Sequence, residues 1–168
     1  MVDFLIWLEE TRPSTWMRES GGAFFSSLVF HSIGMAFVAG IHVVTDLRIL
    51  GVAPRVPRSL MCRYLPVLWA SLLVVALSGL ALLLAYPAKA LTNPVFYFKL
   101  AAIIAALWIM RALLRSAPAD DPGQDLAPAP GKEKALAAIS LVLWVAVITS
   151  GRFLAYTAKV MMASHLLY

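Results

Sequence analysis

The chain has 168 residues, of which 61% are hydrophobic and 14% are charged. A soluble domain of this length cannot bury so much apolar surface in one core, so the composition excludes a soluble enzyme and indicates a membrane protein. The formal net charge is +5, but the basic residues lie mostly beside apolar segments. They form no patch interleaved with aromatic residues, so we expect no nucleic-acid partner. The single cysteine, Cys62, excludes an internal disulfide.

Residues 1–20 precede the first long apolar segment, and we expect them to form a short helix at the membrane interface. Asp3 is placed to cap an apolar turn that contains Trp7, and Pro13 interrupts this turn before Trp16. Amphipathic segments that carry Trp usually lie between lipid and water. Asp3 also stands where a cleaved signal peptide carries basic residues, so we expect the segment to be retained.

Four apolar segments are long enough to cross a bilayer, whose hydrocarbon core of about 30 Å needs about 20 helical residues. Their content of Leu, Ala, Ile and Val favours helices over the alternating pattern of a β-barrel. The sequence therefore predicts an all-α integral membrane four-helix bundle with a short N-terminal interfacial helix. The predicted spans are Gly22 to Leu50, Leu65 to Tyr86, Val95 to Leu114 and Ala135 to Tyr156.

The basic residues of the connections predict the orientation of the chain in a bacterial inner membrane. Residues 116–133 are rich in proline, small residues and acids, which is typical of a flexible connector. Only Lys89 lies in the second connection, whereas the first and third connections are rich in basic residues. These are Arg48, Arg55, Arg58 and Arg63, and Arg111, Arg115, Lys132 and Lys134. The positive-inside rule places both rich connections in the cytoplasm and both termini, with the tail at residues 161–168, in the periplasm.

Two histidines lie within the first predicted span, where an ionisable group is costly and therefore a functional candidate. His31 and His42 are 11 residues apart, which on a helix is about three turns, about 16 Å of rise and about 20° of rotation. They therefore share one face. One interpretation is ordinary packing, in which each imidazole bonds to a neighbouring helix. The other is that they ligate the iron of a b-type haem, with Gly34 leaving room for the porphyrin.

A haem held in this way needs a second axial ligand from outside the first span. Two imidazoles about 16 Å apart on one helix cannot ligate the same iron. The chain offers His165, Met161 and Met162 near its C-terminus. A ligand from a second subunit is the alternative.

Lys99 and Arg152 lie in the third and fourth predicted spans, at about the level of His31. One interpretation is that these three cations converge on an anion or a carbonyl: a haem propionate, a quinone oxygen or a carboxylate of a partner protein. Tyr156, one turn beyond Arg152, would add a hydrogen bond. The alternative is that Lys99 and Arg152 extend their long side chains to the lipid headgroups.

Two further patterns concern the contacts between the spans. Asp46, near the end of the first span, is expected to pair with Arg63 or Arg111 of a neighbouring span. The second and fourth spans share three dipeptides at different spacings, which makes a duplicated helical hairpin only a hypothesis. These dipeptides are Leu68-Trp69, Ser78-Gly79 and Ala85-Tyr86 in the second span, and Leu143-Trp144, Ser150-Gly151 and Ala155-Tyr156 in the fourth.

Several short motifs are spread along nearly the whole chain from Trp7 onward. They are His31-Ser-Ile-Gly34, Asp46-Leu-Arg48-Ile-Leu-Gly51, Asn93-Pro94 before Lys99, and Gly151-Arg-Phe-Leu-Ala-Tyr156. With them the sequence resembles an uncharacterised family of small bacterial inner-membrane proteins, which implies four helices and that membrane. It is more remotely similar to membrane cytochrome b-561 and copper-resistance D bundles, which carry paired histidines on several helices where this chain does not.

The function favoured by these features is an integral-membrane subunit of a respiratory or electron-transfer complex. Its first span would hold a b-type haem or contact a quinone, and its partners would be other membrane or periplasmic subunits or a second copy. The alternatives are a cofactor-free accessory subunit that anchors a larger complex, and a small transporter or relay of protons or metal ions. The chain has no catalytic triad, paired catalytic carboxylates or phosphate-binding loop, so any activity would be the redox chemistry of a cofactor.

Overall fold

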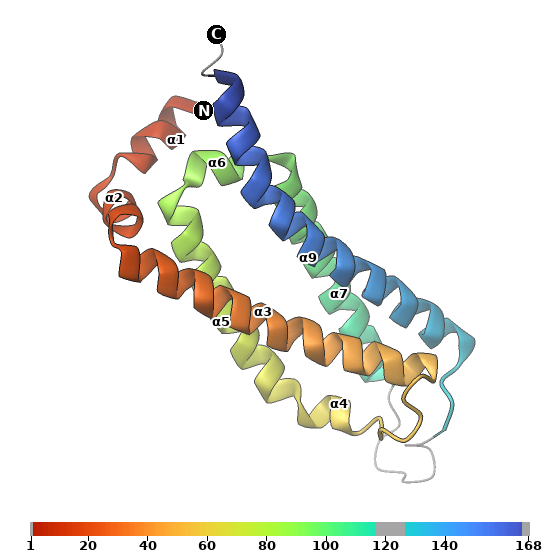
Figure 1. The fold of residues 1–168 in the computed structure, drawn as a ribbon. Coiled ribbons are helices and arrows are strands. Elements are labelled where there is room, and N and C mark those ends of the chain that lie inside the picture. Colours follow the sequence, from red (N-terminus) through yellow and green to blue (C-terminus); the bar gives the residue numbers. More distant parts are fainter. Residues whose placement is uncertain (1, 117–126, 166–168) are drawn as a thin grey trace.

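Four long helices form the body of the molecule: α3 (Gly21–Leu50), α5 (Leu65–Ala85), α7 (Pro94–Arg115) and α9 (Gly131–His165) (Figure 1). The computed structural model describes residues 2–116 and 127–165, with the backbone alone at residues 2, 3, 60 and 155–165. Within these ranges all regular structure is helical. Each long helix is long and apolar enough to span a membrane, in α9 over Gly131–Leu154. The predicted all-α membrane-spanning bundle is confirmed.

Local capping signals explain why α3 and α7 begin and end close to the predicted boundaries. At the start of α3, the Ser20 hydroxyl accepts a hydrogen bond of 3.3 Å from the backbone N–H of Ala23. The helix stops at Gly51, whose φ of 89° is a left-handed conformation that glycine adopts without strain. At the start of α7, Pro94 follows Asn93, whose side chain accepts from the N–H of Val95 at 3.0 Å.

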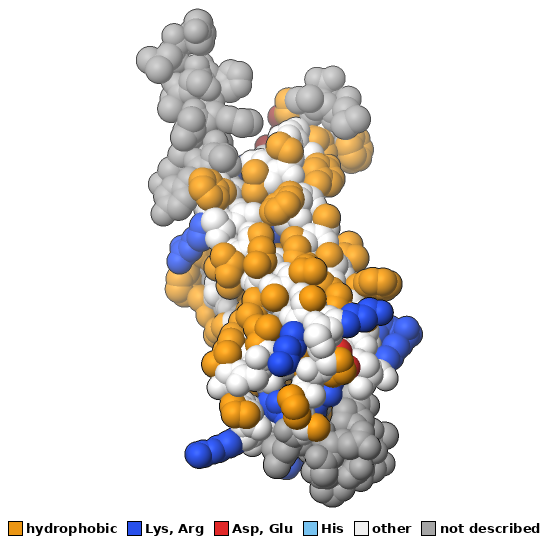
Figure 2. All heavy atoms as spheres, turned by 90° about the vertical axis from the view of Figure 1, so that its right-hand side faces the viewer, with side chains coloured by type: hydrophobic (Ala, Val, Ile, Leu, Met, Phe, Trp, Pro, Cys, Tyr) orange, Lys and Arg blue, Asp and Glu red, His pale blue; other side chains and the backbone are white. Residues whose placement is uncertain are grey.

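The long helices form two antiparallel pairs, α3 with α5 and α7 with α9, and α3 also packs against α9. The core includes Val38 and Ile49 of α3, Leu113 of α7, and Trp144 and Val147 of α9. Many large apolar side chains face outward, and Figure 2 shows them over the middle of the molecule, with several Lys and Arg side chains toward its lower end. An apolar exterior suits lipid, because lipid tails are as apolar as a protein core.

Three short helices gather at one end of the bundle, which we call the α1 end: α1 (Val2–Glu9), α2 (Arg12–Glu19) and α6 (Pro87–Leu91). Arg18 of α2 joins them, because its guanidinium donates to the carbonyls of Glu9 at 2.7 Å and Ala85 at 3.3 Å. The Glu9 carboxylate accepts from the backbone N–H of Ala88 at 3.2 Å. The predicted N-terminal segment is thus two helices, tied to α5 and α6 at their junction.

Two arginines organise the opposite end, which carries the short helix α4 (Leu60–Arg63) and which we call the α4 end. Arg48 donates to the carbonyls of Val56 and Ala127. Arg58 forms an ion pair of 2.5 Å with Glu133 in the first turn of α9. Of the predicted flexible connector, residues 117–126 lie outside the described part, whereas α9 begins at Gly131, ahead of the predicted start at Ala135.

Among the glycines of the described residues, Gly34 has the least space for a side chain, because α5 packs directly against it. A Cβ at this position would lie 2.8 Å from Cγ2 of Val75 and 3.2 Å from the backbone oxygen of Ser71. Small residues allow such approach between membrane helices, where packing replaces the hydrophobic effect. The expectation that Gly34 leaves room for a porphyrin is therefore wrong, because α5 fills that space.

We expect Gly34→Ala to lower the free energy of unfolding by about 1–3 kcal/mol, the usual cost of overpacking a core. The β-branched side chain of Val75 has little freedom to move away from the added methyl group. Thermal unfolding in detergent, followed by circular dichroism, measures the change. Gly40→Ala is the matched control, because nothing lies within 4 Å of its added Cβ. Equal losses in the two variants would contradict the close contact of α3 with α5.

Candidate functional site

Polar side chains gather at two places in the interior of the bundle. The His31 cluster draws on all four long helices and lies toward the α1 end. It consists of His31, Ser78, Gly79, Lys99 and Gly151. The His42 cluster lies between α3 and α9 toward the α4 end. It consists of His42, Asp46, Ser140 and Trp144.

The imidazole of His31 is held by the partner helix α5. Its Nδ1 lies 3.1 Å from the backbone oxygen of Val75 and 3.1 Å from the hydroxyl oxygen of Ser78. A carbonyl only accepts, so Nδ1 carries the proton and donates it. The Ser78 hydroxyl donates its own proton to the oxygen of Val74 at 2.6 Å. In the neutral ring, the lone pair of Nε2 therefore stays available to another group.

Two glycines make room for the basic side chains of this cluster. A Cβ on Gly79 of α5 would lie 3.2 Å from Cε1 of His31, and one on Gly151 of α9 would lie 3.4 Å from Nζ of Lys99. Lys99 is also close enough to His31 for their charges to interact. In each antiparallel pair, a basic residue of the first helix thus lies against a Ser-Gly dipeptide of the second. The sequence analysis did not assign Ser78 or Gly79 to a site, and the shared dipeptides were the signal that could have identified them.

The apparent duplication does not extend to the tryptophans of these dipeptides. Trp69 of α5 is 61% exposed, whereas Trp144 of α9 is 1% exposed. The two antiparallel pairs are alike in how they hold their basic side chains and different in how they contribute to the core.

Arg152 does not join His31 and Lys99, because its side chain is exposed on the surface of α9. The predicted convergence of three cations is therefore wrong for Arg152, and the convergence of His31 and Lys99 on one ligand stays a prediction. The side chains of Tyr156, Met161, Met162 and His165 lie outside the described residues, and their predicted roles stay predictions.

His42 is buried and packs against α9 rather than α5. Its Nδ1 lies 2.8 Å from the backbone oxygen of Val38, one turn back in α3, to which it donates. The ring centroids of His42 and Trp144 are 4.6 Å apart at an interplanar angle of 50°. The two histidines share a face of α3, as their spacing predicts, but α5 covers one and α9 covers the other.

Asp46 is buried one turn beyond His42 and faces α9, where it lies beside Ser140. The expectation that Asp46 pairs with Arg63 or Arg111 is wrong, because both arginine side chains are exposed. Helical periodicity identifies the face of α3 that carries Asp46. The identity of the helix that covers this face depends on packing, so neither Ser140 nor Trp144 was identified from the sequence.

Each histidine has its Nδ1–H bonded to a backbone carbonyl, an arrangement that also orients imidazoles that bind metal through Nε2. No group of three or more His, Cys, Asp and Glu side chains that could hold a metal ion occurs in the described part of the chain. A metal ion without a porphyrin would therefore need ligands in addition to the side chains in these ranges.

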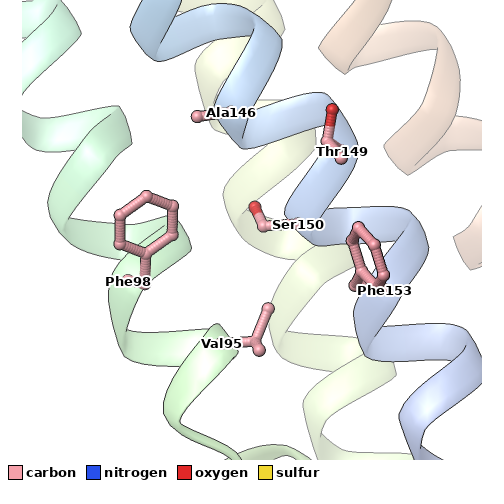
Figure 3. A pocket seen from close by; sticks show the side chains of 6 residues that line it. All are labelled: Val95, Phe98, Ala146, Thr149, Ser150 and Phe153. Carbon is pink, nitrogen blue, oxygen red and sulfur yellow. The ribbon is translucent and has the colours of Figure 1, made fainter.

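An apolar groove of about 330 Å³ runs between α7 and α9 (Figure 3). Phe98 and Phe153 stand on either side of Ser150, with Val95 below them in this view. Lys99 is one turn from Val95 in α7, and Gly151 follows Ser150 in α9. The groove therefore lies beside the part of α7 and α9 where the Lys99 ammonium packs against Gly151.

A second groove, of about 290 Å³, lies beside α3 at the α4 end. Ala36 and Gly40 of α3, Met61 of α4 and Tyr64 lie among its lining residues. No side chain of the His31 cluster lines either groove.

A model of a family of unknown function, DUF6644, matches residues 4–157, and the chain belongs to this family. No curated protein and no solved structure matches the chain. The resemblance to an uncharacterised family is confirmed, and the more remote likeness to cytochrome b-561 bundles gains no support.

Ser78→Ala should lower the free energy of unfolding by about 0.5–1.5 kcal/mol more than Ser27→Ala does. Both hydroxyls donate to a carbonyl of their own helix, but only Ser78 also accepts from His31. Chemical denaturation in detergent measures the difference, and ¹⁵N spectra of labelled histidine report whether Nδ1 keeps its proton. Indistinguishable losses in the two variants would show that the bond to His31 contributes nothing.

Proposed function

We propose that this member of the family is an integral-membrane subunit of a bacterial respiratory or electron-transfer complex, with a quinone as its redox ligand at the His31 cluster. The carrying observation is that two basic side chains lie within the bundle against glycines of the neighbouring helices, His31 of α3 against Gly79 and Lys99 of α7 against Gly151. Both groups cost free energy when they are placed in hydrocarbon, and hydrogen bonds to a bound polar ligand would offset that cost.

The chemistry of the two side chains suits both redox forms of such a ligand. The Lys99 ammonium has only donors, so it would bond a quinone carbonyl oxygen. The neutral His31 imidazole, with Nδ1–H bonded to Val75 and Ser78, would accept the proton of a quinol hydroxyl at Nε2. The redox chemistry itself would belong to the ligand.

The groove between α7 and α9 supports a ligand that arrives from the lipid. Its lining is almost wholly apolar, and the rings of Phe98 and Phe153 flank it (Figure 3). A flat ring with a hydrocarbon tail fits a groove of this kind better than a charged ion does. The Lys99 ammonium, held against Gly151, borders the same stretch of α9.

A b-type haem is a less suitable ligand than a quinone. The open Nε2 of His31 supports it, but α5 occupies the space beside Gly34 and the ring of Trp144 covers His42. A porphyrin at His42 would have to displace the largest fully buried side chain of the bundle, Trp144. A haem would therefore need His31 and an axial ligand from a partner subunit.

A cofactor-free accessory subunit is the second candidate. One observation favours it: both imidazoles already bond within the bundle, His31 to Val75 and Ser78 and His42 to Val38. In that case the chain would anchor other membrane or periplasmic subunits, or a second copy, through its apolar outer surface. The content of bound redox ligand in the purified protein separates the two candidates.

We infer that the α4 end faces the cytoplasm of a bacterial inner membrane and that both termini face the periplasm. Arg55, Arg63, Arg111 and Arg115 are exposed at the α4 end, and Figure 2 shows Lys and Arg side chains toward this end. Basic residues close to spans stay on the cytoplasmic side.

Lys99→Met and His31→Ala should each reduce bound quinone about tenfold, the effect of losing one hydrogen bond of about 1.5 kcal/mol. The measurement is extraction and chromatographic quantification of quinone from detergent-purified protein. Lys89→Met is the matched control, because Lys89 lies against the ring of Tyr86 at the α1 end. An absorption spectrum and a pyridine haemochrome assay of the same samples test for haem. Background levels of both cofactors in the wild type would leave the accessory subunit as the function.

The sole cysteine tests the orientation without any substitution. Cys62 is an exposed residue of α4, so a membrane-impermeant maleimide should label it in inside-out vesicles and spare it in intact spheroplasts. Cys62→Ser in inside-out vesicles gives the background signal. Labelling in spheroplasts alone would place the α4 end in the periplasm.

A further inference from the structure

Four polar atoms in the His42 cluster have no hydrogen-bond partner, although their residues are almost completely buried. They are Nε2 of His42, Oδ2 of Asp46, Oγ of Ser140 and Nε1 of Trp144. Each of the four residues is 1% exposed. A buried polar group without a hydrogen-bond partner costs free energy, so such groups in native proteins nearly always bond to the protein or to an ordered water. Four of them between two packed helices indicate a bound group that completes their bonds.

The hydrogen-bonding roles of these atoms are complementary to water. The indole N–H of Trp144 only donates, and the hydroxyl of Ser140 is able to donate. Nε2 of His42 accepts, since Nδ1 donates to Val38, and an ionised Asp46 carboxylate accepts as well. Water donates twice and accepts twice, and buried waters usually make about three bonds to such groups.

A metal ion suits this set of atoms poorly. Asp46 and His42 are its strong ligands, and no third His, Cys, Asp or Glu side chain joins them in the described part of the chain. The indole N–H of Trp144 presents a positive hydrogen, which repels a cation and attracts a water oxygen.

Asp46 and Ser140 face each other across the contact between α3 and α9, and each has a buried oxygen without a hydrogen-bond partner. Asp46 lies beside Ser140, yet no direct hydrogen bond of normal geometry joins Oδ2 to Oγ. Other buried or partly buried serines, such as Ser78 and Ser150, donate to a carbonyl of their own helix. The Ser140 hydroxyl makes no such hydrogen bond, although α9 offers it backbone carbonyls in the same way.

The charged groups around Asp46 bond elsewhere. On α3, Arg48 donates to the carbonyls of Val56 and Ala127. Arg58 pairs with Glu133 of α9. Arg111 of α7 and Arg63 before α5 are exposed. A carboxylate charge in the hydrocarbon is costly, and His42 is the titratable side chain one turn from Asp46 on the same face of α3.

We propose that α3 and α9 enclose an internal water site, and that its water links the Asp46 carboxyl to the His42 imidazole so that the two side chains share one proton. When Asp46 holds the proton, its O–H donates to the water and the water donates to Nε2 of His42. When the proton moves, the Asp46 O–H bond breaks, the water passes a proton on, and an N–H bond forms at Nε2. The first state is neutral and the second is an internal ion pair, so the site keeps zero net charge.

Infrared spectroscopy of the full-length protein in lipid tests this proposal independently of any redox ligand. Labelling with [4-¹³C]aspartate should shift a protonated carboxyl band at neutral pH, and D₂O should shift the same band because its proton exchanges through the water. Asp46→Asn should abolish the band. Ser140→Ala and Trp144→Phe, which leave the carboxyl in place, should each move the band. The matched controls Ser27→Ala and Trp108→Phe should leave it unchanged, since Ser27 bonds within its own helix and Trp108 is 73% exposed.

Three results would overturn the proposal. One is the absence of an aspartic acid band from labelled wild-type protein at neutral pH. Another is a band that responds to Asp46→Asn but not to Ser140→Ala or Trp144→Phe, since such a carboxyl would have no link to the other two side chains. The third is a high-resolution density map in which a metal ion, or no atom at all, lies among the four side chains. Density for a water within bonding distance of Asp46 and His42 would support the site.

Discussion

Water is absent from the hydrocarbon core of a membrane, so each polar group of a spanning chain must find its partner within the protein. Most hydroxyls of this bundle meet the requirement locally, as Ser27 and Ser78 do by donating to a carbonyl one turn back. The arginines near the helix ends meet it by capping carbonyls, as Arg18 and Arg48 do. What remains are the few groups that bond to another helix, as His31 does, or that have atoms without a hydrogen-bond partner, as His42 and Asp46 do, and these groups define the two polar clusters.

The clusters differ in their access to a ligand. The His31 cluster draws on all four long helices and lies near the apolar groove between α7 and α9, although none of its side chains lines that groove. The His42 cluster is closed, because Trp144 covers the imidazole and α9 covers Asp46. In the proposed function the first site exchanges a redox ligand with the membrane, whereas the second retains water and a proton. Both lie along α3, so this helix connects the lipid-accessible site with the closed one.

Glycines decide how closely the helices approach at each cluster. Gly34 admits the β-branched side chain of Val75 and brings α3 against α5. Gly79 and Gly151 instead admit the ends of polar side chains, the ring of His31 and the ammonium of Lys99. In lipid, where packing and hydrogen bonds replace the hydrophobic effect, one residue type therefore serves both helix association and the placement of charge.

The sequence alone determined the four spans and the common face of His31 and His42, because these depend on hydropathy and on 3.6 residues per turn. It also pointed to the Ser-Gly dipeptides. Tertiary structure decided which helix covers each face: α9 rather than an arginine meets Asp46, α5 fills the space at Gly34, and Arg152 turns outward. Periodicity places a residue around its own helix axis. The rotation of one helix against another follows from side chains distant in sequence, such as Val75 and Trp144, that pack together only after folding.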